Sequence, residues 1–564
     1  MTRNLSLSPP IPRALRIALL AIALCMAPSQ LASQADDTAV MVRRLDSLLA
    51  TFRTDSGPGC VIGVRRGRRT IIRANGFADL ESSRPNDSGT VFEAGSVSKQ
   101  VTAAAIVLLA RRGTLSLEDD VRRWIPELSA SLPRITIGQL LTHQSGLREW
   151  SDLVAVTGWP RGSRAYAMAD MVSLVARQEA TNFPPGGEYA YSNSNYLLAA
   201  EIVSRASRQS FAAFTQSQLF SPLGMTRTSW RTDYRARVAG RATAWSRDGD
   251  GPWMLDMPLE SVVGPGGLLT TVPDLLRWNA ALTGDELGQP LAHEMERAGV
   301  TNTGRSTGYA LGLEVSSSGG ERIVSHAGST AGYRAYAGRV PARAASAAIL
   351  CNSGDVNTER MGPIVLAIAA GIPSPPSEAT PSLGAELPGG TDASRGGTYR
   401  NDRTRQPVTL REFAEGVTLN TWVGFRRHGN AFVTDDGARA LRFDERDRGS
   451  ARGFRVVASG DTVHYTRAEA WAPTSAELAA LAGRYESSET GAAWQLEIAG
   501  DALSAMPRAG VRYTMVPVYR DAFRIREEGW LVTIRRDGAG RATGFDMASG
   551  RTRTLPFTRR ATGD

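Results

Sequence analysis

A stretch rich in proline, serine and glycine, GIPSPPSEATPSLGAELPGGTDASRG, divides this 564-residue chain between Gly371 and Gly396. Such a composition favours neither helix nor strand and is typical of a linker. A chain of this length also exceeds one ordinary domain. We therefore expect separate domains on the two sides of a linker that we assign to residues 373–396.

Before the linker, helical and strand patterns alternate over residues 36–372. The stretch Cys60 to Asp79 is typical of a β-hairpin, and three more strand patterns follow one another within residues 322–354. The run Val101 to Ala110 is apolar on every side, which predicts a buried helix that ends at Gly113. Strands at both ends with helices between them predict an α+β domain, an antiparallel sheet flanked by helices.

After the linker, the pattern changes to short alternating runs separated by Gly, Asp and Asn, which predicts all-β structure. These runs repeat. GTYRN at Gly397 resembles GRYES at Gly483, and GFRVVASGDTVHYTR at Gly453 resembles GFDMASGRTRTLPFTR at Gly544. The offsets, 86 and 91 residues, nearly agree, so we expect two related units of about 80 residues each. Chance similarity between Gly-aromatic turns is the alternative.

The first 35 residues have the pattern of a secretory signal. A basic leader without acids precedes the apolar run Ile17 to Ala27, which is too short to span a bilayer, and small residues precede a cleavage site at Asp36. An uncleaved anchor is the alternative. A lipid anchor on Cys25 is disfavoured because the preceding Leu24 is large. We expect an exported protein, periplasmic or secreted.

The formal net charge is +9, and the cations are mixed with acids, as in Arg442 to Arg455 (RFDERDRGSARGFR). This is a solvated surface pattern, and we find neither a nucleic-acid module nor a later membrane span. HEMER at His293 lacks the second histidine of a zinc helix, so we expect no metal and no cofactor. Cys60 and Cys351 are interpreted as two buried thiols or, in an exported protein, as a disulfide.

The chain contains one lysine, Lys99, among 65 lysine and arginine residues. It follows Ser96 by three residues at the start of a predicted helix, so both side chains lie on one face. Lysine activates a serine hydroxyl when burial and the helix dipole lower its pKa, whereas arginine does not lose its proton. The pair predicts a nucleophilic serine with a lysine base; an accidental position after a common residue is the alternative.

Two further stretches carry groups suited to acyl transfer. PPGGEYAYSNSNYLLAAEIVSRAS places Tyr191 and Asn193 before an amphipathic helix, where a phenol can move protons and an amide can hold a substrate carbonyl. VSHAGSTAGYRAYAGRV places His326 on a strand, with Gly328 and the Ser329 amide after it, where a substrate backbone and an oxyanion can bind. Taken alone, these residues are equally typical of a packed tyrosine, a capping asparagine and a structural histidine.

Together these residues resemble the motifs of the penicillin-recognising serine hydrolases, the family of class C β-lactamases, D,D-peptidases, related esterases and D-aminopeptidases. The three motifs stand here as Ser96-Val97-Ser98-Lys99, Tyr191-Ser192-Asn193 and His326-Ala327-Gly328. LLTHQSGL, PLGM and GPGGLLTTVPDLLRW look like further family landmarks; His143, in the first of these, is interpreted as structural. The resemblance extends over residues 36 to about 372.

The resemblance implies a role for each motif residue: acylation of Ser96, proton transfer by Lys99 and Tyr191, substrate positioning by Asn193, and an oxyanion between the N–H groups of Ser96 and Ser329. The third motif has His326 where β-lactamases and carboxypeptidases have lysine. A mostly neutral imidazole attracts a substrate carboxylate less at pH 7. The histidine is similar to that of the D-aminopeptidases and esterases.

D-aminopeptidases of this family carry two C-terminal antiparallel β-barrels, and a loop of the last barrel recognises a free amino group. The resemblance therefore implies barrels over residues 397–475 and 476–562, with one lipocalin-like barrel over 397–562 as the alternative. Within MVPVYRDAFRIREEGW, the candidates to meet an ammonium group are Asp521, Glu527 and Glu528.

The resemblance also makes the first and last strands of the sheet antiparallel neighbours, which brings Cys60 and Cys351 face to face and leaves thiols or a disulfide open. The expected function is a D-aminopeptidase-like serine hydrolase of amide or ester bonds, acting on small molecules or short peptides. A carboxylesterase or a weak β-lactamase or D,D-peptidase on the same site is the alternative. An alternative from another functional class is a penicillin-binding sensor protein that is acylated without turnover. Homo-oligomer formation is left open.

Overall fold

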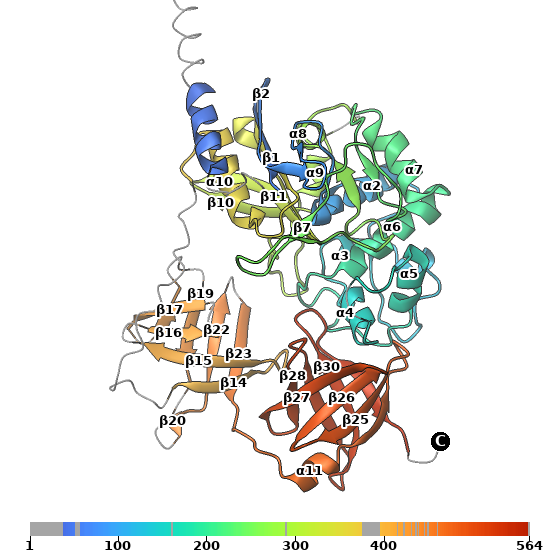
Figure 1. Cartoon of the computed structure of the whole chain (residues 1–564), viewed down its shortest axis with the longest axis vertical. Helices are drawn as coiled ribbons and strands as arrows, with labels where there is room; N and C mark the ends of the chain where they lie inside the picture. Colours follow the sequence, from blue (N-terminus) through green and yellow to red (C-terminus); the bar gives the residue numbers. More distant parts are fainter. Residues whose placement is uncertain are drawn as a thin grey trace, which may run out of the picture.

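The computed structural model describes residues 38–50, 57–159, 162–287, 290–374 and 395–561, with gaps of one or two residues between 414 and 460. The expected signal and most of the expected linker lie outside these residues. An α+β domain lies above two β-barrels in Figure 1. Within the described ranges, no helix is both long and apolar enough to cross a membrane.

A six-stranded antiparallel sheet forms the centre of the first domain, in the order β10-β11-β12-β13-β1-β2. Its strands are β1 (Cys60–Arg66), β2 (Arg69–Ala74), β10 (Glu314–Ser318), β11 (Glu321–Thr330), β12 (Tyr333–Val340) and β13 (Ala345–Cys351). The hairpin and the three consecutive strands predicted from the sequence are β1–β2 and β11–β13. The predicted α+β fold is confirmed.

Alternate residues of the sheet face two different layers, as the period of a strand requires. On β13, Ile349 and Cys351 pack with α10 (Thr358–Ala370), whereas Ala348 and Leu350 pack into the core that contains the other helices. Figure 1 shows α10 and the N-terminal helix, described over residues 38–49, on one side of the sheet, and α2 and α8 on the other. Because both faces are covered, every residue of the central strand β13 and all but Arg334 of its neighbour β12 are buried.

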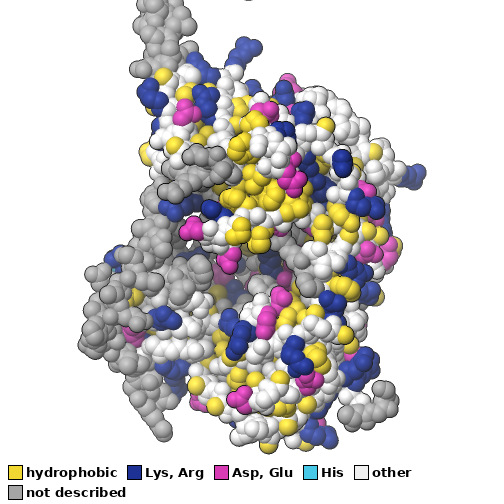
Figure 2. Space-filling view, viewed as in Figure 1, with side chains coloured by type: hydrophobic (Ala, Val, Ile, Leu, Met, Phe, Trp, Pro, Cys, Tyr) yellow, Lys and Arg dark blue, Asp and Glu magenta, His cyan; other side chains and the backbone are white. Residues whose placement is uncertain are grey.

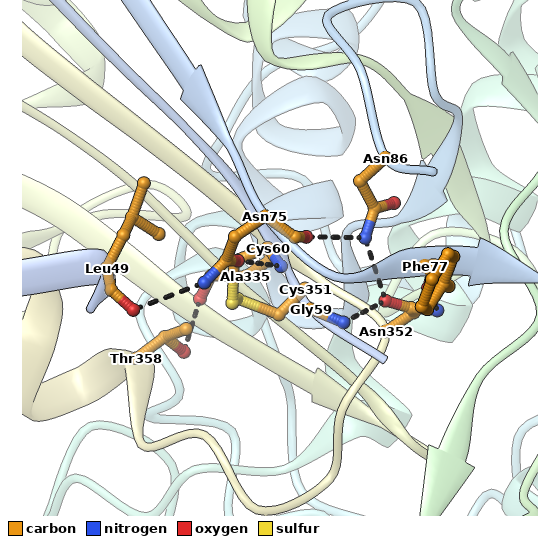
Figure 3. The surroundings of a disulfide bond; sticks show 10 residues. All are labelled: Leu49, Gly59, Cys60, Asn75, Phe77, Asn86, Ala335, Cys351, Asn352 and Thr358. Carbon is orange, nitrogen blue, oxygen red and sulfur yellow. Dashed lines mark hydrogen bonds between the residues drawn. A yellow bond between two sulfur atoms is a disulfide. The ribbon is translucent and has the colours of Figure 1, made fainter. Parts of the chain in front are cut away.

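Cys60 and Cys351 form a disulfide between the neighbouring strands β1 and β13 (Figure 3). The two residues stand opposite each other in the strand register and are 291 positions apart in the chain. Asn75 and Asn352 accept hydrogen bonds from the backbone N–H groups of Cys60 and Gly59, at 3.0 and 2.9 Å. The structure thus decides between the two states that the sequence left open. Closing so long a loop stabilises the fold by about 2–5 kcal/mol.

The predicted buried helix is α2, which begins after the short 3₁₀ turn η1 (Gly95–Val97) and ends before Gly113, a glycine with φ +69°. Helix α6 packs across it. The helices of the domain are α2 (Ser98–Arg111), α3 (Ile137–Leu141), α4 (Trp150–Ala155), α5 (Met168–Ala176), α6 (Asn193–Ser207), α7 (Phe211–Thr215), α8 (Val272–Ala281), α9 (Ala292–Met295) and α10. The two longest buried helices, α2 and α6, carry the first two motifs at their N-termini.

Two closed eight-stranded barrels follow, so the alternative of one merged barrel is wrong. The first contains β14 (Gly397–Asn401), β15 (Pro407–Phe413), β16 (Gly416–Leu419), β17 (Val423–His428), β18 (Ala431–Val433), β19 (Arg439–Phe443), β22 (Gly453–Ala458) and β23 (Asp461–Arg467). The second contains β24 (Gly483–Glu486), β25 (Ala493–Ala499), β26 (Ala502–Arg508), β27 (Val511–Tyr519), β28 (Ala522–Ile525), β29 (Leu531–Arg536), β30 (Ala542–Ala548) and β31 (Leu555–Arg559).

The second barrel is joined to the α+β domain through apolar packing. Its core side chains, among them Trp494 and Phe545, belong to the same continuous hydrophobic cluster as the helices of the α+β domain. The Trp494 indole N–H donates to the backbone oxygen of Val156 at 2.7 Å. The core of the first barrel, around Phe425 and Phe454, forms a cluster of its own. The second barrel is therefore the one that shares its core with the α+β domain.

Charged side chains are spread over the surface rather than gathered in one patch on the face seen in Figure 2. Dark-blue cationic side chains lie over both the upper domain and the second barrel, with acids between them. Several form exposed pairs, such as Arg541 with Asp537 at 2.9 Å and Arg560 with Glu486 at 2.7 Å. This is the solvated arrangement that the mixed charge pattern of the sequence predicts.

Candidate active site

The turn that carries Ser96 lies against the edge of strand β11. Gly95 has φ +49°, and a side-chain carbon added there would lie 2.7 Å from the backbone nitrogen of Ser329. A side-chain carbon added at Gly328 would lie 2.1 Å from the carbonyl oxygen of Ala94. Only glycine permits this close approach, because real side-chain carbons do not come so near to backbone atoms. The first and third motifs are thereby brought into contact.

The Lys99 side chain is fully buried beside Ser96. Its Nζ lies 3.1 Å from Ser96 Oγ, 2.8 Å from Asn193 Oδ1 and 2.8 Å from the carbonyl oxygen of Pro265. A neutral amine has two N–H groups and one lone pair. With the two N–H groups donated to the amide oxygen and the carbonyl oxygen, the lone pair faces the Ser96 hydroxyl.

Burial lowers the pKa of Lys99 well below its ordinary value. The Glu149 carboxylate opposes this shift, and the Arg551 guanidinium adds to it. Desolvation is the largest effect because an ammonium loses its hydration in the interior. The amine is thus prepared to be neutral and to accept a proton, which an arginine in the same place is not.

Asn193 is the first residue of α6, and its side-chain oxygen is held by Lys99. Its backbone N–H, one of the unpaired donors at a helix start, donates to the Glu149 carboxylate at 2.7 Å. Glu149 is itself buried and also accepts from the backbone N–H of Ser151 at 3.4 Å. Burial raises the pKa of Glu149, against the smaller opposing effect of the bond from Asn193. The second motif is therefore fixed by a carboxylate that the sequence motifs do not include.

Tyr191 lies between Lys99 and His143. The Lys99 Nζ is 4.8 Å from the centroid of its ring, and the His143 ring is 4.3 Å away, centroid to centroid. Burial raises the pKa of the phenol far above its ordinary value, and hydrogen bonding to Ser96 opposes this only in part. The phenol therefore stays protonated at neutral pH, which suits it to pass protons rather than to act as a free phenolate.

His326 lies buried on β11. Its Nδ1–H donates to the carbonyl oxygen of Ala327 at 2.6 Å, which leaves Nε2 to accept from the Tyr309 hydroxyl at 3.0 Å. Burial, with a smaller effect from Lys99, lowers the pKa of His326 to about 3. The imidazole is therefore neutral at physiological pH, and this position gives a substrate carboxylate no positive charge.

His143 contacts the second motif through hydrogen bonds to its ring nitrogen Nδ1. It has φ +55°, and its Nδ1 accepts from the backbone N–H of Ser192 at 3.2 Å and from the Asn195 side-chain amide at 3.0 Å. Burial lowers the pKa of His143 well below its ordinary value, so it is neutral too. These contacts are those of a structural histidine that positions the Tyr191 ring.

One hairpin of the second barrel reaches the site. Residues 549–554, which we call the site hairpin, connect β30 to β31. The hydroxyls of Ser549 and Thr552 both donate to the Asp152 carboxylate of α4, the second at 2.8 Å. The Asn182 side chain bonds the hairpin backbone at two positions, donating at 2.9 Å and accepting at 2.9 Å. The backbone of the site hairpin is therefore fixed on the catalytic domain.

Arg551 projects from this hairpin toward the motifs. Its guanidinium carbon lies 5.0 Å from the centroid of the Tyr191 ring, and a guanidinium nitrogen lies 3.9 Å from a Glu149 carboxylate oxygen. Lys99 and Arg551 thus lie at similar distances from the same phenol, one from each domain. The second barrel contributes a cation to the site.

The three acids named as candidates in the second barrel have partners inside that barrel. Asp521 pairs with Arg536 at 2.7 Å. Glu527 accepts from the backbone N–H of Thr514 at 2.9 Å, and Glu528 accepts from the Tyr513 hydroxyl at 3.4 Å. The hairpin that contacts the site is a different one, and its charge is positive. In the described part of the chain, no three His, Cys, Asp or Glu side chains gather as a metal site.

Sequence reasoning named Ser96, Lys99 and the other motif residues but missed Glu149 and Arg551. Glu149 lies two positions after the end of the landmark LLTHQSGL, so that landmark held a signal. For Arg551 there was no comparable signal in the sequence. The matched repeat segments Gly453 to Arg467 and Gly544 to Arg559 are 15 and 16 residues long, so they differ by only one residue. The connection between β30 and β31 is longer than that between β22 and β23 mainly because β31 is shorter than β23, which only the structure shows.

Comparison with known proteins agrees with this architecture. A D-aminopeptidase of Cereibacter sphaeroides is 25% identical over 547 residues, which cover 93% of this chain and 99% of that protein. Esterase EstB of Burkholderia gladioli is 34% identical over 203 residues, 34% of this chain and 51% of the esterase. The structure of an octameric penicillin-binding protein homologue from Pyrococcus abyssi has the same fold, with a TM-score of 0.54 and 18% identity, over 84% of this chain and 99% of that one.

The fold is that of a β-lactamase-like serine hydrolase followed by two barrels. The family model described as Beta-lactamase matches residues 45–370, more than half of the chain. The chain belongs to this family.

Proposed function

We propose that the chain is an exported serine hydrolase that cleaves amide or ester bonds through an acyl-enzyme on Ser96, with the specificity of a D-aminopeptidase-like peptidase. The observation that carries this proposal is the buried Lys99 amine, 3.1 Å from the Ser96 hydroxyl and with a lowered pKa. A serine becomes a nucleophile when an adjacent base takes its proton.

In the acylation step, Ser96 Oγ attacks the substrate carbonyl carbon as its proton passes to Lys99 Nζ. The oxyanion that forms lies between the backbone N–H groups of Ser96 and Ser329. The close contact of their two segments supports this pair of donors, because a side-chain carbon at Gly328 would be 3.0 Å from the Ser96 nitrogen. The neutral Tyr191 phenol carries the proton on to the leaving nitrogen or oxygen as its bond to the carbonyl carbon breaks.

In the deacylation step, water attacks the ester carbonyl carbon of acylated Ser96, and Lys99 again accepts the proton. The bond between that carbon and Ser96 Oγ then breaks, the acid product leaves, and Lys99 returns the proton to Ser96 Oγ. Asn193 holds the substrate carbonyl through its side-chain N–H₂, since its oxygen is already bonded to Lys99. His326, neutral and bonded to Tyr309, lines the strand edge without adding charge. Each of these roles is assigned to a side chain that touches the Ser96 turn or its immediate neighbours.

Amide hydrolysis of the D-aminopeptidase type is supported by a relative that covers nearly the whole chain, both barrels included. A carboxylesterase on the same site is the second candidate, because the esterase relative is more similar over the shorter region that it matches. Export is supported by the signal pattern of residues 1–35 and by the disulfide, which is typical of an oxidising compartment.

A panel of three chromogenic substrates tests the proposal: a D-alanyl 4-nitroanilide, a short-chain nitrophenyl ester and a cephalosporin. Anilide turnover that is lost in Ser96→Ala supports the peptidase, and turnover of the ester alone supports the esterase. Stoichiometric labelling by the cephalosporin without turnover supports the non-catalytic penicillin-binding protein. Ser217→Ala, at an exposed serine after α7, is the matched control and keeps full activity. Activity that survives Ser96→Ala contradicts the proposal.

A further inference from the structure

The site hairpin carries two arginines with different surroundings. The Arg553 guanidinium forms two hydrogen bonds to the Glu188 carboxylate, at 3.1 and 2.8 Å, and its side chain is 15% exposed. The Arg551 side chain is 51% exposed, and its nearest carboxylate is 3.9 Å away. Arg553 therefore serves the docking of the hairpin, whereas Arg551 keeps its donors available beside the reactive groups.

The Glu149 carboxylate makes no direct hydrogen bond to the Arg551 guanidinium. The Glu149 carboxylate already accepts from the backbone N–H of Asn193 at 2.7 Å and from the Ser151 hydroxyl at 3.2 Å. At 3.9 Å, the guanidinium lies beyond hydrogen-bond distance from it. Among the described residues, the side-chain contacts of Arg551 are this ion pair and the Tyr191 ring, and the Asp152 carboxylate, already bonded to Ser549 and Thr552, is a further charge that interacts with it. The five N–H donors of Arg551 are thus free to bind an incoming group.

The side chains around Arg551 indicate which charge a group that binds to it carries. His326 is neutral, and Lys99 is buried and bonded to three oxygens, so neither offers an accessible positive charge. A guanidinium binds a carboxylate through two parallel N–H···O bonds and repels an ammonium. The hairpin backbone is fixed through Asp152 and Asn182, so the guanidinium is presented from a rigid support.

We propose that Arg551 is a specificity-determining residue that binds a carboxylate of the substrate next to the scissile bond. This inference rests on the proposed function and adds the substrate class: short peptides with a D-residue at the scissile bond and a free carboxylate close to it. In a dipeptide, the free carboxylate lies one residue beyond the scissile bond. The second barrel thus supplies the positive charge that the neutral imidazole of the third motif does not.

Two pairs of substrates test this inference in the full-length protein. D-alanyl-D-alanine and its C-terminal amide differ only in a carboxylate on the leaving side. N-succinyl-D-alanyl 4-nitroanilide and the matching succinamoyl compound differ only in a carboxylate on the acyl side. Arg551→Gln removes the guanidinium and keeps a polar side chain. Arg541→Gln is the matched control, because Arg541 is an exposed arginine at the other end of β30.

We expect Arg551→Gln to lower kcat/KM about 10- to 100-fold for the carboxylate member of one pair, mainly through KM, because a charge-assisted hydrogen bond is lost. The uncharged member changes less than about threefold, and Arg541→Gln changes neither. Which pair responds tells whether the leaving side or the acyl side carries the carboxylate. Equal losses for both members of both pairs, or a fall in kcat alone, overturn the inference.

The failure of this inference is distinguishable from failure of the proposed function. A neutral fluorophosphonate probe labels Ser96 without any carboxylate. If the wild-type protein is labelled and does not prefer the carboxylate substrates, the inference fails and the serine hydrolase stands. If the wild-type protein is not labelled and hydrolyses none of the substrates, both fail.

Discussion

Two cations lie beside the Tyr191 ring, and they come from regions of very different character. Lys99 belongs to the Ser96 turn, is fully buried, and has a lowered pKa. Arg551 belongs to the site hairpin of the second barrel and is half exposed. In the proposed mechanism the first has to lose its proton, whereas the proposed role of the second requires it to keep its charge. This difference explains why a chain with a single lysine has it at position 99 and has arginine at 551.

The two barrels also differ in how they are attached to the α+β domain. They have the same strand number and order, but the first has its own core and the second shares one with the catalytic domain. The contact of the second barrel includes a buried ion pair, Arg148 with Glu489 at 2.5 Å, both side chains 2% exposed. The contact of the first includes Arg305 with Asp461 at 3.3 Å, each 26% exposed. The tightly docked barrel is the one that contributes to the site.

The largest expected effect on kcat/KM comes from replacing lysine by arginine at position 99, compared with arginine by lysine at position 551. Lys99→Arg replaces an amine that can be neutral with a permanently charged guanidinium that cannot accept the Ser96 proton, so kcat/KM falls about 10³-fold for every substrate. Arg551→Lys keeps a charge that binds carboxylate, so its carboxylate preference falls less than in Arg551→Gln. Steady-state kinetics on the substrates above measure both. Arg112→Lys, at the end of α2, is the control with unchanged activity. More than a tenth of the wild-type activity in Lys99→Arg would refute the proton-acceptor role.

The contrast between the barrels is sharpened by breaking one ion pair in each. Glu489→Gln leaves the Arg148 guanidinium buried without its partner charge, which destabilises the docked state by about 3–5 kcal/mol. Arg305→Gln removes a partly exposed pair, leaves Asp461 paired with Arg403 inside the barrel, and costs less than about 1 kcal/mol. Thermal unfolding followed by tryptophan fluorescence measures both, since Trp494 lies at the docked interface. Equal shifts in the unfolding temperature would mean that the barrels are attached with similar strength.

The smallest expected effect is a displacement of the pH profile. Because neutral Lys99 is the active form, activity with a neutral ester is present above the pKa of Lys99 and is lost as the pH falls through it. Arg551 lowers that pKa, so Arg551→Gln raises it and moves the acidic limb of kcat/KM to higher pH. Glu149 raises it, so Glu149→Gln moves the limb to lower pH. If both substitutions move the acidic limb in the same direction, the ionisation seen in the pH profile is not that of Lys99.

The sequence by itself determined the α+β fold, the order of strands and helices in its core, and the residues of the three motifs. It did so because these features depend on neighbouring positions: alternation along a strand, or Ser96 and Lys99 on one face of a helix. The repeated Gly-aromatic segments likewise predicted two related units of short strands, and the family resemblance implied that these units are barrels.

Only the tertiary structure decided which groups from distant segments meet. Thr552 and Asp152, whose bond fixes the site hairpin, are 400 positions apart, and the two cysteines of the disulfide are 291 apart. The state of His326 also depends on the whole fold, because its low pKa comes from burial and from Lys99 rather than from its strand neighbours. Burial and long-range charge are properties of the packed chain, and no local pattern records them.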